Sequence, residues 1–129
     1  MNTEVKGVPV EIREVTDYPK SELVRLEVSP AEPLSFPLHL RIPSWAANPV
    51  VTVCGHPQEG VKAGEIFIVN REWHEDDVVE LSFPMKVSVS RWFENSVAIE
   101  RGPLVYALDV KGRWEKKINQ SPNRKGQEY

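Results

Sequence analysis

Acidic side chains cluster near the middle of the chain and are the first candidates for chemistry. The cluster consists of Glu72, Glu75, Asp76 and Asp77, with Trp73 among them. Several carboxylate oxygens can hold calcium, and two acids across a cleft can hydrolyse a glycosidic bond. The spacing fits no calcium-binding loop, because it lacks both the glycine at the turn and the closing glutamate. We therefore predict a solvated, charged hairpin turn and no metal site.

The histidines and the single cysteine show no pattern of a catalytic or metal site. His39, His56 and His74 lie in separate segments, without H-x-H or H-x-x-x-H spacing. Cys54 follows an apolar stretch, where a buried thiol behaves as a small inert hydrophobic group. A nucleophile also needs a base and an orienting group, and the sequence identifies neither. We therefore assign no catalytic residue and no cofactor to this chain.

The four tryptophans are the remaining candidates, because an indole face can stack on a sugar ring. They are Trp45, Trp73, Trp92 and Trp114. Large aromatic side chains more often fill the core or the edges of a sandwich. Trp92, followed by Phe93 after an alternating strand, is the best candidate for exposure. Trp92 and Trp73 are the predicted carbohydrate contacts, although Trp73 at a strand end also suits core packing.

Short strands must position these side chains. The chain holds 18 Val and 6 Ile against 8 Leu and 6 Ala, and β-branched residues favour pleated sheets. No apolar helical pattern persists for three turns, and eleven prolines interrupt the chain. We predict an all-β, two-sheet antiparallel sandwich, jelly-roll-like, of eight or nine short strands. Alternating or apolar runs place them at 8–12, 21–29, 38–42, 50–54, 65–70, 78–83, 85–89, 97–100 and 104–108.

Length and charge limit the other possibilities. The 129 residues suggest one domain, predicted over 1–110, followed by a polar, basic and flexible segment at 111–129. The net charge of −3 argues against nucleic-acid binding. No apolar run approaches the roughly 18 residues of a membrane helix, and the polar start shows no signal peptide. A single cysteine is compatible with a cytoplasmic, periplasmic or secreted location.

One run of residues carries a family resemblance. Phe36–Ala46, read as FPLHLRIPSWA, resembles a hallmark of the β-L-arabinofuranosidase-like glycoside hydrolases of family 127. Segments in the matching order span about residues 8 to 108. They are Thr16–Pro19, Val51–Gly55, Asn70–Trp73, Asp76–Leu81, Pro84–Met85 and Arg101–Tyr106. The sequence departs from the family pattern at Cys54, where Asn is usual, and at Asp76, where Gly is usual. These departures argue against tight turns with positive φ there.

The resemblance implies a longer protein in which catalysis belongs to a different domain. In that family an (α/α)6 barrel carries catalysis, with a zinc-bound cysteine nucleophile and a glutamate acid/base, and a β-sandwich follows it. The matching segments all belong to the sandwich, so no catalytic residue carries over, and Cys54 is not that nucleophile. A domain that packs on a barrel needs an apolar surface left over from its core. The segment 30–37 and the Trp92–Phe93 corner are the predicted sources of that surface.

Three functions follow as hypotheses. The first is a non-catalytic sandwich domain of a glycoside hydrolase acting on L-arabinofuranosides or related plant glycans, with the barrel of the same polypeptide as its partner. The second is an autonomous carbohydrate-binding module that uses an exposed tryptophan to hold plant polysaccharide. The third is a plain protein-interaction domain.

Overall fold

The computed structural model describes residues 1–109 and 111–113. Their regular structure is almost entirely β, with one short 3₁₀ turn, η1 (Phe93–Asn95). The strands are β1 (Asn2–Val5), β2 (Val8–Thr16), β3 (Leu23–Pro30), β4 (Leu34–Arg41), β5 (Val50–Val53), β6 (His56–Pro57), β7 (Ile66–Trp73), β8 (Asp77–Ser82), β9 (Val87–Arg91), β10 (Val97–Arg101) and β11 (Leu104–Tyr106). Most of the segment 111–129, predicted to be flexible, lies outside the described residues, and that prediction stays open.

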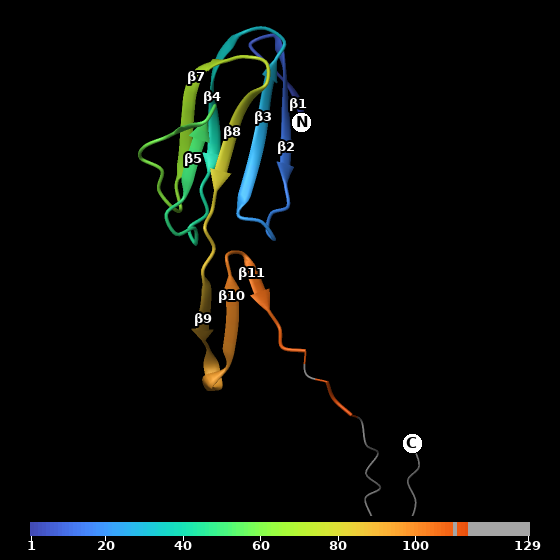
Figure 1. Cartoon of the computed structure of the whole chain (residues 1–129), viewed down its shortest axis with the longest axis vertical. Helices are drawn as coiled ribbons and strands as arrows, with labels where there is room; N and C mark the ends of the chain where they lie inside the picture. The colour runs from blue at the N-terminus through green and yellow to red at the C-terminus, as the bar shows by residue number, and fades with distance from the viewer. Residues whose placement is uncertain (110, 114–129) are drawn as a thin grey trace, which may run out of the picture.

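A six-stranded antiparallel sheet forms the larger layer of the molecule (Figure 1). Its strand order is β1-β2-β3-β8-β5-β6, so β8, which follows β7 in the chain, lies between β3 and β5. Side chains alternate between its two faces, and the inner face is apolar. Its central strands each contribute a fully buried valine: Val10, Val28, Val51 and Val79. The outer face carries charged pairs such as Arg25 with Glu80.

A two-stranded ribbon of β4 and β7 forms the second layer. Its register pairs Leu40 with Phe67 and Leu38 with Val69, which places these apolar side chains on one face. That face packs on the six-stranded sheet and completes the core, in which Trp73 is fully buried. The predicted all-β antiparallel sandwich is confirmed. The polar strand β1 and the two-residue strand β6 were not predicted, because neither has an apolar alternation.

The last three strands form a sheet of their own rather than joining the sandwich. In this sheet β10 lies between β9 and β11, all antiparallel. Figure 1 shows it extending below the sandwich from the chain segment that follows β8. The short segment 83–86, which contains Pro84, connects the two parts. The strands predicted at 85–89, 97–100 and 104–108 are therefore present, but large side chains on both faces of their sheet are exposed, so within the described part of the chain no second layer covers either face.

The two turns that depart from the family pattern nevertheless have positive φ. Cys54 has φ 49° and is followed by Gly55 at 79°, between the paired residues Val53 and His56. That is a two-residue hairpin turn of the type that favours Asn-Gly. Asp76 has φ 60° and its carboxylate accepts a hydrogen bond from the Ser29 hydroxyl at 3.3 Å. The expectation against such turns was wrong, because the strands on either side fix the backbone whatever residue stands there.

Candidate functional site

The three-stranded sheet has one apolar and one polar face. The register pairs Val89 with Ile99 and Ile99 with Tyr106, so these side chains share a face. We call this the apolar face; it consists of Val87, Val89, Val97, Ile99, Leu104 and Tyr106, with Arg91 and Arg101 at its ends. The residues between them form the polar face, which consists of Ser88, Ser90, Ala98 and Glu100, with Val105 as its large apolar member.

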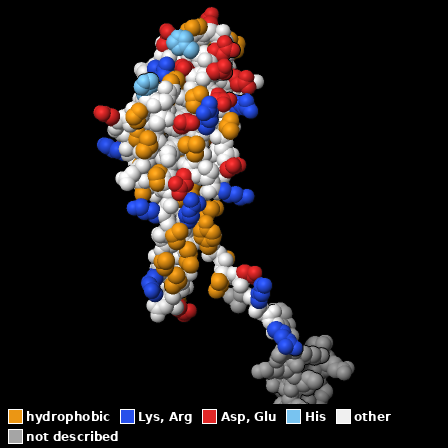
Figure 2. Space-filling model, viewed as in Figure 1, with side chains coloured by type: hydrophobic (Ala, Val, Ile, Leu, Met, Phe, Trp, Pro, Cys, Tyr) orange, Lys and Arg blue, Asp and Glu red, His pale blue; other side chains and the backbone are white. Residues whose placement is uncertain are grey.

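The apolar face is open to solvent. Val87 is 66% exposed, and even the central Ile99 is 46% exposed. Hydrophobic side chains gather visibly over β9–β11 in Figure 2. A shallow cavity of about 400 Å³ lies on this face, lined by Val87, Ile99, Tyr106, Ala107 and Leu108. Soluble monomers rarely leave a contiguous apolar surface of this kind uncovered, so it is a candidate docking surface.

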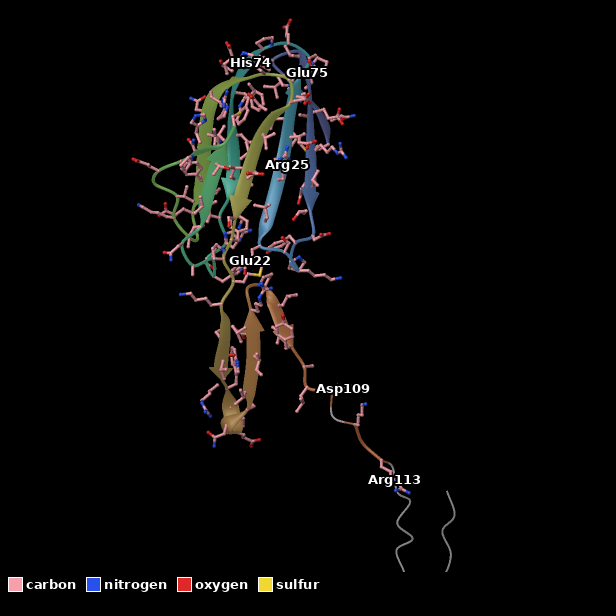
Figure 3. The ribbon with its side chains drawn as sticks, viewed as in Figure 1. Glu22, Arg25, His74, Glu75, Asp109 and Arg113 are labelled. Carbon is pink, nitrogen blue, oxygen red and sulfur yellow. The ribbon has the colours of Figure 1, made fainter. Side chains whose placement is uncertain are left out.

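A carboxylate connects this sheet to the sandwich. Oε1 of Glu22, labelled at the junction in Figure 3, accepts hydrogen bonds from the backbone N–H of Met85 at 3.0 Å and from Nη2 of Arg101 at 2.9 Å. Gly102, in the turn between β10 and β11, packs closely against Met85 and Trp45 at this junction. A Cβ on Gly102 would lie 2.6 Å from Sδ of Met85 and 3.2 Å from the Trp45 ring. These contacts fix the direction in which the apolar face points.

A second polar network closes one end of the sandwich and centres on Asp77. Its carboxylate accepts hydrogen bonds from the backbone N–H of His74 at 2.9 Å and from the thiol of Cys54 at 3.1 Å. Nη2 of Arg71 lies 3.4 Å away, and the Arg71 guanidinium also lies 5.3 Å from the centre of the Trp73 ring. The network joins β5, β7 and β8 at their ends.

The electrostatics of Asp77 suit a structural role. Burial raises the pKa of this carboxyl, but the hydrogen bonds from His74 and Cys54 and the charge of Arg71 together lower it below its ordinary value of 3.8. A carboxylate held in its ionised form is a poor proton donor at neutral pH. Among the described residues, no group of three His, Cys, Asp or Glu side chains is arranged to hold a metal ion.

Asp77→Asn should weaken the acid dependence of folding. Because the pKa of Asp77 is lower in the folded chain, its contribution to stability is complete above its unfolded pKa and is lost as pH falls through the folded pKa. We expect the variant to lose about 1–2 kcal/mol at pH 7 and to show a shallower decline in acid. Urea unfolding from pH 7 to pH 2 measures both. Glu75→Gln, an exposed carboxylate in the same turn, is the control, and an equal acid decline in Asp77→Asn and the wild type would contradict this role.

The structure separates the two tryptophans predicted to contact carbohydrate. Trp92 is 68% exposed, as a sugar contact requires. Trp73 is 0% exposed and its Nε1 donates to the Phe36 carbonyl at 2.9 Å, so it has no free face and is withdrawn as a candidate. Trp45 is half-buried between Tyr18 and Phe83. Trp114 lies outside the described residues.

The structure also tests the predicted burial of Cys54 and the two predicted apolar surfaces. Cys54, expected to be buried, is exposed, because it occupies the turn rather than the strand. Of the two predicted apolar surfaces, the Trp92–Phe93 corner is open, with Phe93 85% exposed. In the segment 30–37, Pro30 and Phe36 are buried, whereas Pro33 and Pro37 are exposed. The apolar face itself was missed. Its signal in the sequence is the period-two alternation of Val87 and Val89 with serines after Pro84.

Comparison with known proteins places the sandwich in a family. A family model described as the middle domain of GH127 β-L-arabinofuranosidases matches residues 1–85. The chain belongs to the GH127 family. The match ends at Met85, where the sandwich gives way to the connection to β9. The GH127 middle domain is thus the β1–β8 sandwich, and the sheet with the apolar face lies beyond the matched residues.

Solved structures agree with the GH127 assignment. Ara127N-Se, a GH127 β-L-arabinofuranosidase from Geobacillus stearothermophilus T6, is 36% identical with a TM-score of 0.72, over 81% of this chain and 18% of its own. A protein described as a glycoside hydrolase is 34% identical with a TM-score of 0.73, over 81% and 19%. The GH127 β-arabinofuranosidase BT3674 is 26% identical with a TM-score of 0.69, over 81% and 20%.

The GH127 relatives are much longer than this chain. The chain spans about a fifth of the length of the solved structures it matches. None of the curated proteins compared with it matches. In the described residues, no helix is long and apolar enough to span a membrane.

Proposed function

We propose that this chain is a non-catalytic sandwich domain of a glycoside hydrolase that acts on L-arabinofuranosides or related plant glycans. In this proposal it supports the catalytic barrel of the same polypeptide. The substrate class is taken from the relatives, one of which is described as a β-L-arabinofuranosidase and another as a β-arabinofuranosidase. The observation that carries the supporting role is the exposed apolar face of β9–β11.

The chemistry of that face favours a large partner surface over a small ligand. Its centre is made of Val89, Ile99 and Tyr106, which offer shape and apolar area but few groups to orient a ligand. Covering such a face removes apolar surface from water at about 25 cal/mol per Å². Helices and sheets both pack on a flat face of β-branched side chains.

The position of the face also favours docking within one polypeptide. The sandwich holds the sheet through the bond between Glu22 and Arg101, so the face keeps one direction relative to the middle domain. A domain of the same chain would meet this face at a high effective concentration and needs little intrinsic affinity. Arg91, at one end of the face, has no ion-pair partner among the described residues and predicts an acidic side chain on the partner.

The test compares two adjacent residues on opposite faces. The chain is mixed with the separately expressed catalytic domain of its parent enzyme, and the dissociation constant is measured by calorimetry. Ile99→Lys should weaken binding at least about thirtyfold, because it buries an unpaired charge in the interface. Ala98→Lys places the same charge on the polar face and should bind like the wild type. The proposal fails if the wild type does not bind, or if Ile99→Lys binds as well as Ala98→Lys.

A further inference from the structure

An exposed tryptophan lies on the side of the hairpin opposite the apolar face. Trp92 follows β9, and its Nε1 donates a hydrogen bond to Oγ of Ser90 at 2.9 Å. Ser90 Oγ in turn donates to Oε1 of Glu100 on β10 at 3.0 Å. The backbone N–H of Trp92 also bonds the Ser96 carbonyl at 2.9 Å and closes the loop. The indole is therefore held at its edge while it remains 68% exposed.

The hydrogen bond to Ser90 preorganises the Trp92 ring for binding. An exposed side chain normally loses rotamer freedom when it binds, and a ring already fixed by a hydrogen bond has less to lose. Phe93 provides the contrast, since it is 85% exposed and its side chain has no polar atom to fix it. The fixed ring lies on the polar face and is linked through Ser90 to the Glu100 carboxylate.

We propose that Trp92, Ser90 and Glu100 form a contact platform for a neutral oligosaccharide. The C–H face of a sugar ring packs on an indole face, and the hydroxyls at its rim bond carboxylate and hydroxyl groups. Glu100 and the loop residue Glu94 make the platform acidic, which disfavours phosphate-bearing ligands. The choice of arabinose-containing sugars as the first probe rests on the proposed function.

The two faces of the sheet would work independently. Ser90 and Ala98 lie opposite each other on the polar face, whereas their neighbours Val89 and Ile99 point to the other side. A partner that covers the apolar face thus leaves the Trp92 platform in solvent. With a catalytic domain docked on the apolar face, the glycan contact would lie on the opposite, polar face of the same sheet.

The experiment titrates the ¹⁵N-labelled chain with linear arabino-oligosaccharides and, in parallel, with cello-oligosaccharides. Binding is followed by NMR through the indole N–H signal of Trp92 and, in every variant, through the backbone amide signals of β9 and β10, with the remaining amide signals as the check on folding. We expect a saturable shift with at least one of the two sugars. Trp92→Ala should weaken that binding about tenfold, and Ser90→Ala, which keeps the ring but removes its hydrogen bond, about threefold. Phe93→Ala is the matched control and should bind within twofold of the wild type.

The outcomes separate this proposal from the docking proposal. It is overturned if neither sugar gives a saturable shift up to about 10 mM, since such a platform should bind more tightly than that. It is also overturned if Trp92→Ala keeps wild-type affinity, or if Phe93→Ala loses as much as Trp92→Ala. Ile99→Lys should keep sugar binding while it loses the catalytic domain, and Trp92→Ala should do the reverse.

Discussion

Trp73→Ala should lower the free energy of unfolding by about 3–5 kcal/mol, the range for removing a large buried aromatic side chain. Its ring is fully buried, lies 5.8 Å from the ring of Phe36, and is covered by the Arg71 guanidinium at 5.3 Å. The substitution also leaves the Phe36 carbonyl without its indole donor. Urea unfolding followed by circular dichroism measures the change, and unfolding of the whole sandwich at room temperature is within the expected range.

Trp92→Ala is the matched control for Trp73→Ala. It removes the same side chain from a position that is 68% exposed, so the free energy of unfolding should change by no more than about 0.5 kcal/mol. Equal losses in the two variants would contradict the assignment of Trp73 to the core. Trp73→Phe, which keeps most of the apolar volume, should fall between the wild type and Trp73→Ala.

Gly102→Val should release the three-stranded sheet from the sandwich. Gly102 has φ +58°, a conformation that costs a residue with a side chain roughly 1–2 kcal/mol, and more for a β-branched one. The new Cβ would also press into Met85 and Trp45, and overpacking of this kind costs about 1–3 kcal/mol. A total near 3 kcal/mol corresponds to amide exchange in β10 and β11 that is roughly 100-fold faster.

Gly60→Val is the control that separates the backbone cost of positive φ from the cost of overpacking. Gly60 also has positive φ, at +78°, but a Cβ there meets no atom within 4 Å. It should therefore show the backbone cost alone and leave exchange in β10 and β11 unchanged. If Gly102→Val left this exchange unchanged as well, the contact among Gly102, Met85 and Trp45 would not be what holds the sheet in place.

Most strands could be predicted from the sequence because their signal is local. Leu38, Leu40 and Ile42 alternate with polar residues, and they point inward in β4 and just after it. The polar strand β1 lacks that signal, since it forms only by pairing with β2. The same alternation at Val87 and Val89 predicted a strand correctly, but a period of two cannot say whether a second layer covers it.

The candidate site was harder to predict because it depends on contacts that are distant in sequence. Trp73 and Trp92 both stand at strand ends, and only the packing of the β4–β7 ribbon on the six-stranded sheet buries Trp73. The hydrogen bond between Glu22 and Arg101 joins residues 79 positions apart. Cys54 shows a third limit, since the pairing of β5 with β6 places it in a turn rather than in the apolar strand before it.

The split of the small sheet into two unlike sides has an evolutionary consequence. Neighbouring residues such as Val89 and Ser90 are under different constraints. In the two proposals Val89 faces a fixed protein surface, whereas Ser90 faces solvent or a weakly bound glycan. Tolerance to substitution should therefore alternate along β9 and β10, with low tolerance on the apolar face and higher tolerance on the polar face. Insertion of one residue there would move each following side chain of the strand to the opposite face of the sheet, so this short segment should tolerate changes in length poorly.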